Sequence, residues 1–126
     1  MDSIFSTKIS ELAEEERPRE KLLLRGKSAL TDAELIAILI GSGTPSMSAV
    51  DLSRMILRHI NHDLSALARL SVKDLMKFKG IGKAKSSVLV AALELGRRRM
   101  VFEVTNQIDT ILASKDAYNL LRPHLS

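Results

Sequence analysis

The sequence predicts an all-α fold of about five helices in its central part, followed by a C-terminal linker and a short helix. Several segments carry apolar residues at helical spacing. Most of them follow a Ser or Thr in the position of a helix N-cap. Two Gly-x-Gly breaks, one at Gly41 and Gly43 and the other at Gly80 and Gly82, each separate a pair of these segments.

The N-terminal part begins with a polar leader, residues 1–16, for which we expect weak order. The first helix is predicted from Arg17 to Arg25. Pro18 suits a first helical turn, and Gly26 is a natural C-terminal stop.

A second helix is predicted after Thr31, which forms a capping box with Glu34. The apolar run of residues 35–40 that follows would also fit a buried strand. The upstream cap and an apolar pattern continuous from Leu30 favour a helix. This helix ends at the break of residues 41–45.

Four further elements follow in order. Helices are predicted over residues 48–60, 64–70 and 71–78, the last with Ser71 as N-cap, and a long helix from Lys83 to about Met100. Residues 101–104 alternate apolar and acidic side chains, which predicts a short extended segment. Ser114 is expected to cap a final helix from Lys115 to Leu121. The predicted domains are therefore 1–16, 17–100 and 101–126.

The segment from Phe78 to Lys85 is the strongest functional signal. Gly80 and Gly82 would allow a sharp turn, and Ile81 between them would plug into the core. The amides of Gly80, Gly82 and Lys83 would then face solvent at a helix N-terminus, which is an anion site. Three lysines, Lys79, Lys83 and Lys85, would add positive charge. This pattern predicts a helix-hairpin-helix element that binds DNA phosphate; the alternative is a packed turn with solvated lysines.

The charge distribution favours a nucleic-acid partner. The chain has a net charge of +4, yet residues 69–100 contain nine basic and two acidic side chains. A basic segment centred on a hairpin is the footprint of nucleic-acid binding. Arg97, Arg98 and Arg99 have an alternative explanation, because cations also favour the C-terminal end of a helix.

The earlier Gly-x-Gly break indicates a second, degenerate copy of the hairpin. Gly41, Ser42, Gly43 and Thr44 form its candidate turn, in a longer loop that contains Pro45. We expect a mainly structural role, with a second phosphate contact through Ser42, Thr44 or Ser46 as the alternative. Two such units predict a tandem helix-hairpin-helix module.

At this point the chain resembles the N-terminal domain of the RadC family, bacterial proteins historically named for DNA repair. The residues that carry the resemblance are 17–23, 30–39, 79–85 and 91–98. The resemblance implies that the chain is truncated before a JAMM/MPN metallopeptidase-like domain, with residues 114–118 resembling the entry to it. Any protease-like activity would belong to that domain.

Catalytic and metal chemistry are not predicted for this chain. It contains no Cys, and its histidines are His59, His62 and His124. His59 and His62 lack the further ligands that zinc needs, so surface or helix-capping roles are expected. The hairpin also resembles that of DNA glycosylases, but Ala84 stands where their bifunctional members place a nucleophilic lysine. Few aromatic residues are present to line a base pocket.

The predicted function is sequence-independent DNA binding through the hairpin backbone and its lysines, without a cofactor. The resemblance to helix-hairpin-helix proteins adds a candidate monovalent-cation site on the carbonyls of Phe78, Gly80 and Ile81. The alternative function is a protein-interaction or regulatory module for the metallopeptidase-like domain. Lacking an apolar membrane-spanning run, the chain is expected in the cytoplasm without a membrane partner.

Overall fold

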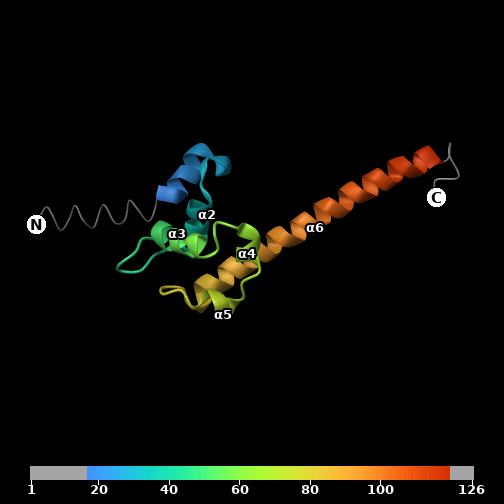
Figure 1. The fold of residues 1–126 in the computed structure, drawn as a ribbon. Coiled ribbons are helices and arrows are strands. Elements are labelled where there is room, and N and C mark those ends of the chain that lie inside the picture. The colour runs from blue at the N-terminus through green and yellow to red at the C-terminus, as the bar shows by residue number, and fades with distance from the viewer. Residues whose placement is uncertain (1–16, 120–126) are drawn as a thin grey trace, which may run out of the picture. The chain divides into compact units, whose positions relative to one another are not determined.

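A computed structural model describes residues 17–119, and its elements in this range are all helical (Figure 1). β-type pairing within the range is limited to an isolated bridge between Thr44 and Met47. The all-α prediction is therefore confirmed. The predicted leader, residues 1–16, and the end of the predicted final helix at Leu121 lie outside the described residues.

The N-terminal helices begin and end where the sequence signals place them. Residues 17–25 are helical, and the amide of Gly26 donates to the Leu22 carbonyl at 2.9 Å with φ at +84°. A 3-10 turn, η1, spans Lys27–Ala29 and leads into α2, Asp32–Ile40. The predicted capping box of α2 is present, and Gly41 ends the helix with φ at +80°.

The remaining helices are each preceded by a polar side chain or by the hairpin. Ser48 caps α3, Ala49–His59, and Asp63 caps α4, Leu64–Ala68. Ser71 and Asp74 form a second capping box at α5, Val72–Leu75. The last helix, α6, spans Lys83–Asn119.

The core lies among α2, α3, α4, α5 and the first turns of α6. α2 packs against α3, and Ala33, Ile36, Ala37 and Ile40 of α2 are buried. Five large apolar side chains are almost completely buried: Leu52, Ile56, Leu67, Leu75 and Leu89. Because these side chains come from both sides of the hairpin at residues 78–82, the core fixes where that hairpin sits.

The C-terminal part corrects the sequence prediction. Residues 101–104, expected to be extended, are helical, and Ser114 lies inside α6 instead of capping a new helix. From Arg97 to Asn119 the chain contains no Gly or Pro to stop a helix. One acidic residue among three apolar ones is too short a pattern to distinguish a strand from a helix.

The three arginines that were expected near a helix end lie within α6. Glu94 pairs with Arg97 and Arg98 at 2.9 Å, and Arg99 pairs with Glu103 at 3.1 Å. The two guanidinium groups beside Glu94 lower the pKa of its carboxyl group to about 2. These side chains therefore support the helix through ion pairs along its own surface.

The chain divides into two compact units, one up to Ala92 and the other from Leu93. In the second unit the described side chains from residue 95 to residue 115 are all exposed. Among the described residues, no helix combines the length and the apolar character needed to span a membrane.

Candidate nucleic-acid interface

The connection between α5 and α6 forms a tight turn. Gly80 has φ at +94°, in the left-handed region that favours glycine. The Ile81 amide donates to the Phe78 carbonyl at 3.1 Å and closes the turn. Ile81 is only 4% exposed. The predicted sharp turn at Gly80 and the predicted burial of Ile81 are therefore confirmed.

The two glycines of this turn have different roles. A Cβ atom on Gly80 would overlap Thr44 Cγ2 in the first loop and lie 3.4 Å from Leu52 Cδ2. A Cβ atom on Gly82 would meet nothing within 4 Å, and the φ of Gly82 is not positive. The expectation that Gly82 also supplies a forbidden backbone angle is wrong. What Gly82 provides is open space beside its own amide.

The amides predicted to bind phosphate are available. Within residues 17–119, the backbone N–H groups of Gly80, Gly82 and Lys83 donate to no acceptor, and all three residues are exposed. The carbonyl groups are used instead, since Gly82 O accepts the Ser86 amide at 3.1 Å and the Ser86 hydroxyl at 2.7 Å. Free amides at the start of a long helix carry partial positive charge that favours an anion.

The three hairpin lysines do not act alike. Lys79 and Lys83 are exposed, and in the described part of the chain neither forms an ion pair. The ammonium group of Lys85 instead donates to the Ser42 carbonyl at 2.7 Å and lies 3.4 Å from the Gly43 carbonyl. Lys85 thus ties α6 to the first loop, so Lys79 and Lys83 are the hairpin lysines whose charges are unpaired within the described residues.

The first Gly-x-Gly loop is held by its own hydrogen bonds. The Thr44 amide donates to the Met47 carbonyl at 2.8 Å. The Thr44 hydroxyl accepts from the amides of Ser46 and Met47 at 3.3 and 3.0 Å. A Cβ atom on Gly43 would overlap the Met47 carbonyl. These contacts, together with Lys85 and Gly80, fit the mainly structural role expected for this loop.

The candidate cation site rests on the turn carbonyls. Phe78 O accepts the amide of Ile81, and a carbonyl oxygen has a second lone pair for a cation. The arrangement is compatible with a monovalent cation without requiring one. Residues 17–119 contain no cluster of three His, Cys, Asp or Glu side chains that could hold a metal ion. His124 lies outside the described residues.

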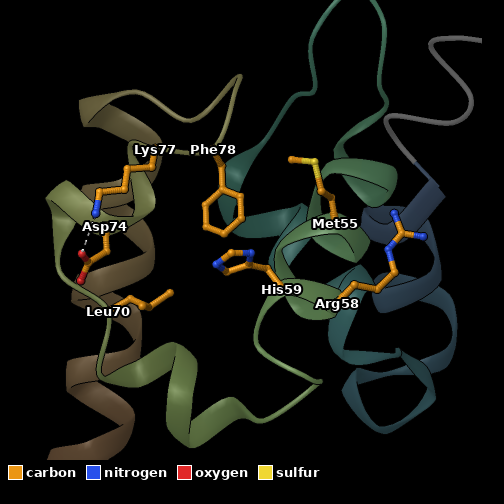
Figure 2. A pocket seen from close by; sticks show the side chains of 7 residues that line it. All are labelled: Met55, Arg58, His59, Leu70, Asp74, Lys77 and Phe78. Carbon is orange, nitrogen blue, oxygen red and sulfur yellow. Dashed lines mark ion pairs between the residues drawn. The ribbon is translucent and has the colours of Figure 1, made fainter.

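A pocket below the hairpin was missed by the sequence analysis. Its volume is about 730 Å³, and it lies between α3 and residues 70–78. Figure 2 shows Phe78 and His59 pointing toward one another inside it, with ring centroids 5.1 Å apart and ring planes at 89°. The pocket is lined by Met55, Arg58, His59, Leu70, Asp74, Lys77 and Phe78.

The sequence contains only a weak indication of this pocket. His59 lies at the C-terminal end of α3 as expected, but its contact with Phe78 joins residues far apart in the sequence. Asp74 and Lys77 form an ion pair of 3.8 Å at one side of the pocket (Figure 2). Hydrogen bonds from the Ser71 amide and hydroxyl, and then the charge of Lys77, lower the pKa of Asp74.

Comparison with known proteins identifies the family. A family model described as UPF0758 N-terminal matches residues 9–87. The chain belongs to this family. The match includes three of the four segments that carry the resemblance to RadC, residues 17–23, 30–39 and 79–85, and ends before residues 91–98.

Relatives of the UPF0758 chain are similar over nearly its whole length. It is 50% identical over 115 residues to the UPF0758 protein of Flavobacterium johnsoniae, covering 91% of this chain and 49% of that protein. It is 44% identical over 115 residues to the UPF0758 protein of Carboxydothermus hydrogenoformans, covering 91% and 50%. The counterpart in Porphyromonas gingivalis is 40% identical over 119 residues, covering 94% and 52%.

The UPF0758 chain therefore spans about half the length of these curated relatives. No solved structure matches it.

Proposed function

We propose that this UPF0758 N-terminal region binds DNA through the phosphate backbone, without sequence specificity, as a tandem helix-hairpin-helix module. One observation carries the proposal: the amides of Gly80, Gly82 and Lys83 donate to no acceptor within the described residues, these three residues are exposed, and Lys79 and Lys83 flank the amides. Backbone amides and lysines contact phosphate oxygens and do not read bases. The region acts by binding, in the cytoplasm, and any catalysis in the full-length protein belongs elsewhere.

The resemblance to RadC supports the same proposal. It implies a module that precedes a metallopeptidase-like domain in a DNA repair protein, and the relatives are long enough to contain a further domain. The first loop contributes by fixing the second hairpin, since Lys85 and Gly80 both contact it.

The salt dependence of DNA binding tests this function. With Lys79 and Lys83 each neutralising one phosphate, duplex affinity should fall roughly twelvefold between about 50 and 200 mM salt, because each contact contributes a slope near −0.9. Fluorescence anisotropy of a labelled duplex measures the slope. Lys83→Gln should reduce the slope by about 0.9.

Lys85→Met is the matched control, because Lys85 is engaged by carbonyl groups of the first loop. It should leave the salt slope unchanged and lower the thermal stability, as a charge-assisted hydrogen bond contributes about 1 kcal/mol or more. Absence of duplex binding at low salt, or equal binding by a Lys79→Glu, Lys83→Glu double variant, would overturn the proposal. In that case the rival role, a regulatory module for the metallopeptidase-like domain, becomes the better account of the exposed surface.

A further inference from the structure

The pocket below the hairpin combines an apolar interior with polar groups at its sides. The rings of His59 and Phe78 meet edge to face at its middle, and Leu70 points toward them (Figure 2). Asp74 and Lys77 form their ion pair at one side. The volume of about 730 Å³ falls in the range of pockets that hold small organic ligands.

This combination suits a flat heteroaromatic ring. A nucleobase has two apolar faces that stack on aromatic side chains. Its edge carries donors and acceptors, which a carboxylate such as Asp74 and an ammonium such as Lys77 can complement. Arg58 is also a lining residue, but Figure 2 shows its guanidinium directed away from Phe78 and His59, so the charged groups at the side of the pocket are Asp74 and Lys77.

The pocket meets the hairpin at one residue, Phe78. Phe78 belongs to both, since its ring enters the pocket and its carbonyl accepts the Ile81 amide that closes the hairpin. Gly80 follows Phe78 by two residues, so their Cα atoms can be at most about 7.6 Å apart. One nucleotide can therefore place its phosphate at the hairpin amides and its base near Phe78.

We propose that the pocket receives one unpaired base of the DNA strand whose phosphate is held by the hairpin. The inference rests on the proposed DNA binding and adds a substrate preference to it. A base stacked in an intact duplex has no free face for the pocket, so bulged, mismatched or gapped DNA is the expected ligand class. A nucleotide carries a phosphate and a flat ring a short distance apart, which suits the amides and the pocket together. A peptide with acidic and apolar side chains is the alternative that the test must exclude.

The test compares two duplexes that carry 2-aminopurine at one position, either in a single-nucleotide bulge or paired with thymine. Wild-type protein should bind the bulged duplex on the order of tenfold more tightly, within the range expected for stacking one base on aromatic side chains. The fluorescence of the bulged 2-aminopurine should change on binding, whereas that of the paired base should not.

Variants of the pocket connect this preference to named side chains. His59→Ala should lower the bulge preference to within about twofold while paired-duplex affinity is retained, and Phe78→Ala should lower the bulge preference as well. Met76→Ala, in the same connection but outside the pocket lining, is the control and should keep the preference. If Phe78→Ala melts early, His59→Ala decides the result, because His59 is exposed on α3 and its removal leaves no buried cavity.

Each outcome has a distinct meaning. Tighter binding of the bulge that depends on His59 and Phe78 supports the inference. Equal affinity for both duplexes, or a preference that survives both variants, overturns the inference while DNA binding stands. Failure to bind either duplex overturns both. If an acidic peptide, and not DNA, shifts the His59 ring signals in NMR spectra, the pocket is a protein-docking site and the inference is wrong.

Discussion

Gly80 and Gly82 look equivalent in the sequence motif, yet the structure gives them separate tasks. Gly80 combines a positive φ with close contact to Thr44, so it is needed for folding. Gly82 has neither constraint and lies beside an exposed amide. Sequence alone predicts the turn but cannot separate the two roles, because the partner of Gly80 lies in a loop far away in the sequence.

Substituting each glycine separates folding from binding. Gly80→Ala should destabilise the protein by about 1–3 kcal/mol, the usual cost of a non-glycine residue in strained backbone. Gly82→Ala should leave the melting temperature within about 2 °C, since the new methyl group enters open space, and should weaken DNA binding by obstructing phosphate approach. Thermal denaturation and anisotropy measure the two effects.

A second variant isolates the steric part of the Gly80 effect. Thr44→Ser removes the Cγ2 atom that a Cβ at position 80 would meet, but keeps the hydroxyl that accepts from Met47. The double variant Gly80→Ala with Thr44→Ser should recover part of the lost stability, and the remainder reports the backbone strain. If Gly82→Ala proved the more destabilising of the two glycine substitutions, these assignments would be wrong.

Among the helices, the starts were predictable and the far end of α6 was not. Thr31 with Glu34 and Ser71 with Asp74 form the capping boxes that their spacing predicts. Caps are local, so a four-residue pattern carries the necessary information. Ion pairs along α6, such as that of Glu94 with Arg97, help to keep the helix continuous. From the sequence, these pairs can be recognised only after the segment has been assumed to be helical.

The capping box of α2 makes stability depend on pH. The Thr31 amide, and then the Lys21 ammonium at 3.0 Å, lower the pKa of Glu34, although burial opposes them. Because the folded pKa lies below the unfolded value, Glu34 stabilises the fold above its ordinary pKa, and this contribution disappears as the pH falls through the folded value. The melting temperature should therefore drop on acidification.

Glu34→Gln isolates this contribution from that of other carboxylates. The glutamine side chain keeps an acceptor for the Thr31 amide but loses the charge that pairs with Lys21, so the variant should lose up to about 1 kcal/mol at neutral pH. Its melting temperature should fall less steeply between about pH 6 and pH 3. Differential scanning calorimetry at several pH values provides the comparison. Parallel curves for the wild type and the variant would show that Glu34 does not titrate differently in the folded and unfolded states.

At the scale of the whole molecule, the two units differ in the interactions that stabilise each of them. The unit up to Ala92 has a buried core that includes Leu52 and Ile56. The unit from Leu93 is a helix whose described side chains are exposed from residue 95 onward. A helix without tertiary packing is maintained only by its own hydrogen bonds and ion pairs, and such helices are marginal in water.

Hydrogen exchange should reveal this difference. Amides in residues 95–115 are expected to exchange at least about 100-fold faster than those of the buried part of α3, because local opening of an unpacked helix requires little free energy. About 1 M salt should increase the difference by screening the ion pairs of Glu94 and Arg99. Mass spectrometry of peptic fragments resolves both segments. Equal protection would mean that residues 95–115 are covered by another chain in solution.

The fold class was accessible from the sequence, whereas the pocket at His59 and Phe78 was not. Periodicity and caps describe one segment at a time, but a pocket depends on which segments meet. The hairpin lies between these cases. Its turn and its free amides can be predicted from local sequence signals. The hydrogen bond from Lys85 to the first loop can be recognised only in the tertiary structure.

The contact between Gly80 and Thr44 also constrains how the family can diverge. Alanine at position 80 fits only where the residue at position 44 lacks the Cγ2 methyl group of threonine. A residue bulkier than threonine at position 44 would push the two loops apart. The two positions should thus covary among homologous chains, as residues in direct contact do. A substitution that enlarges a side chain in either loop would therefore need a compensating substitution in the other, so the two turns are expected to evolve together.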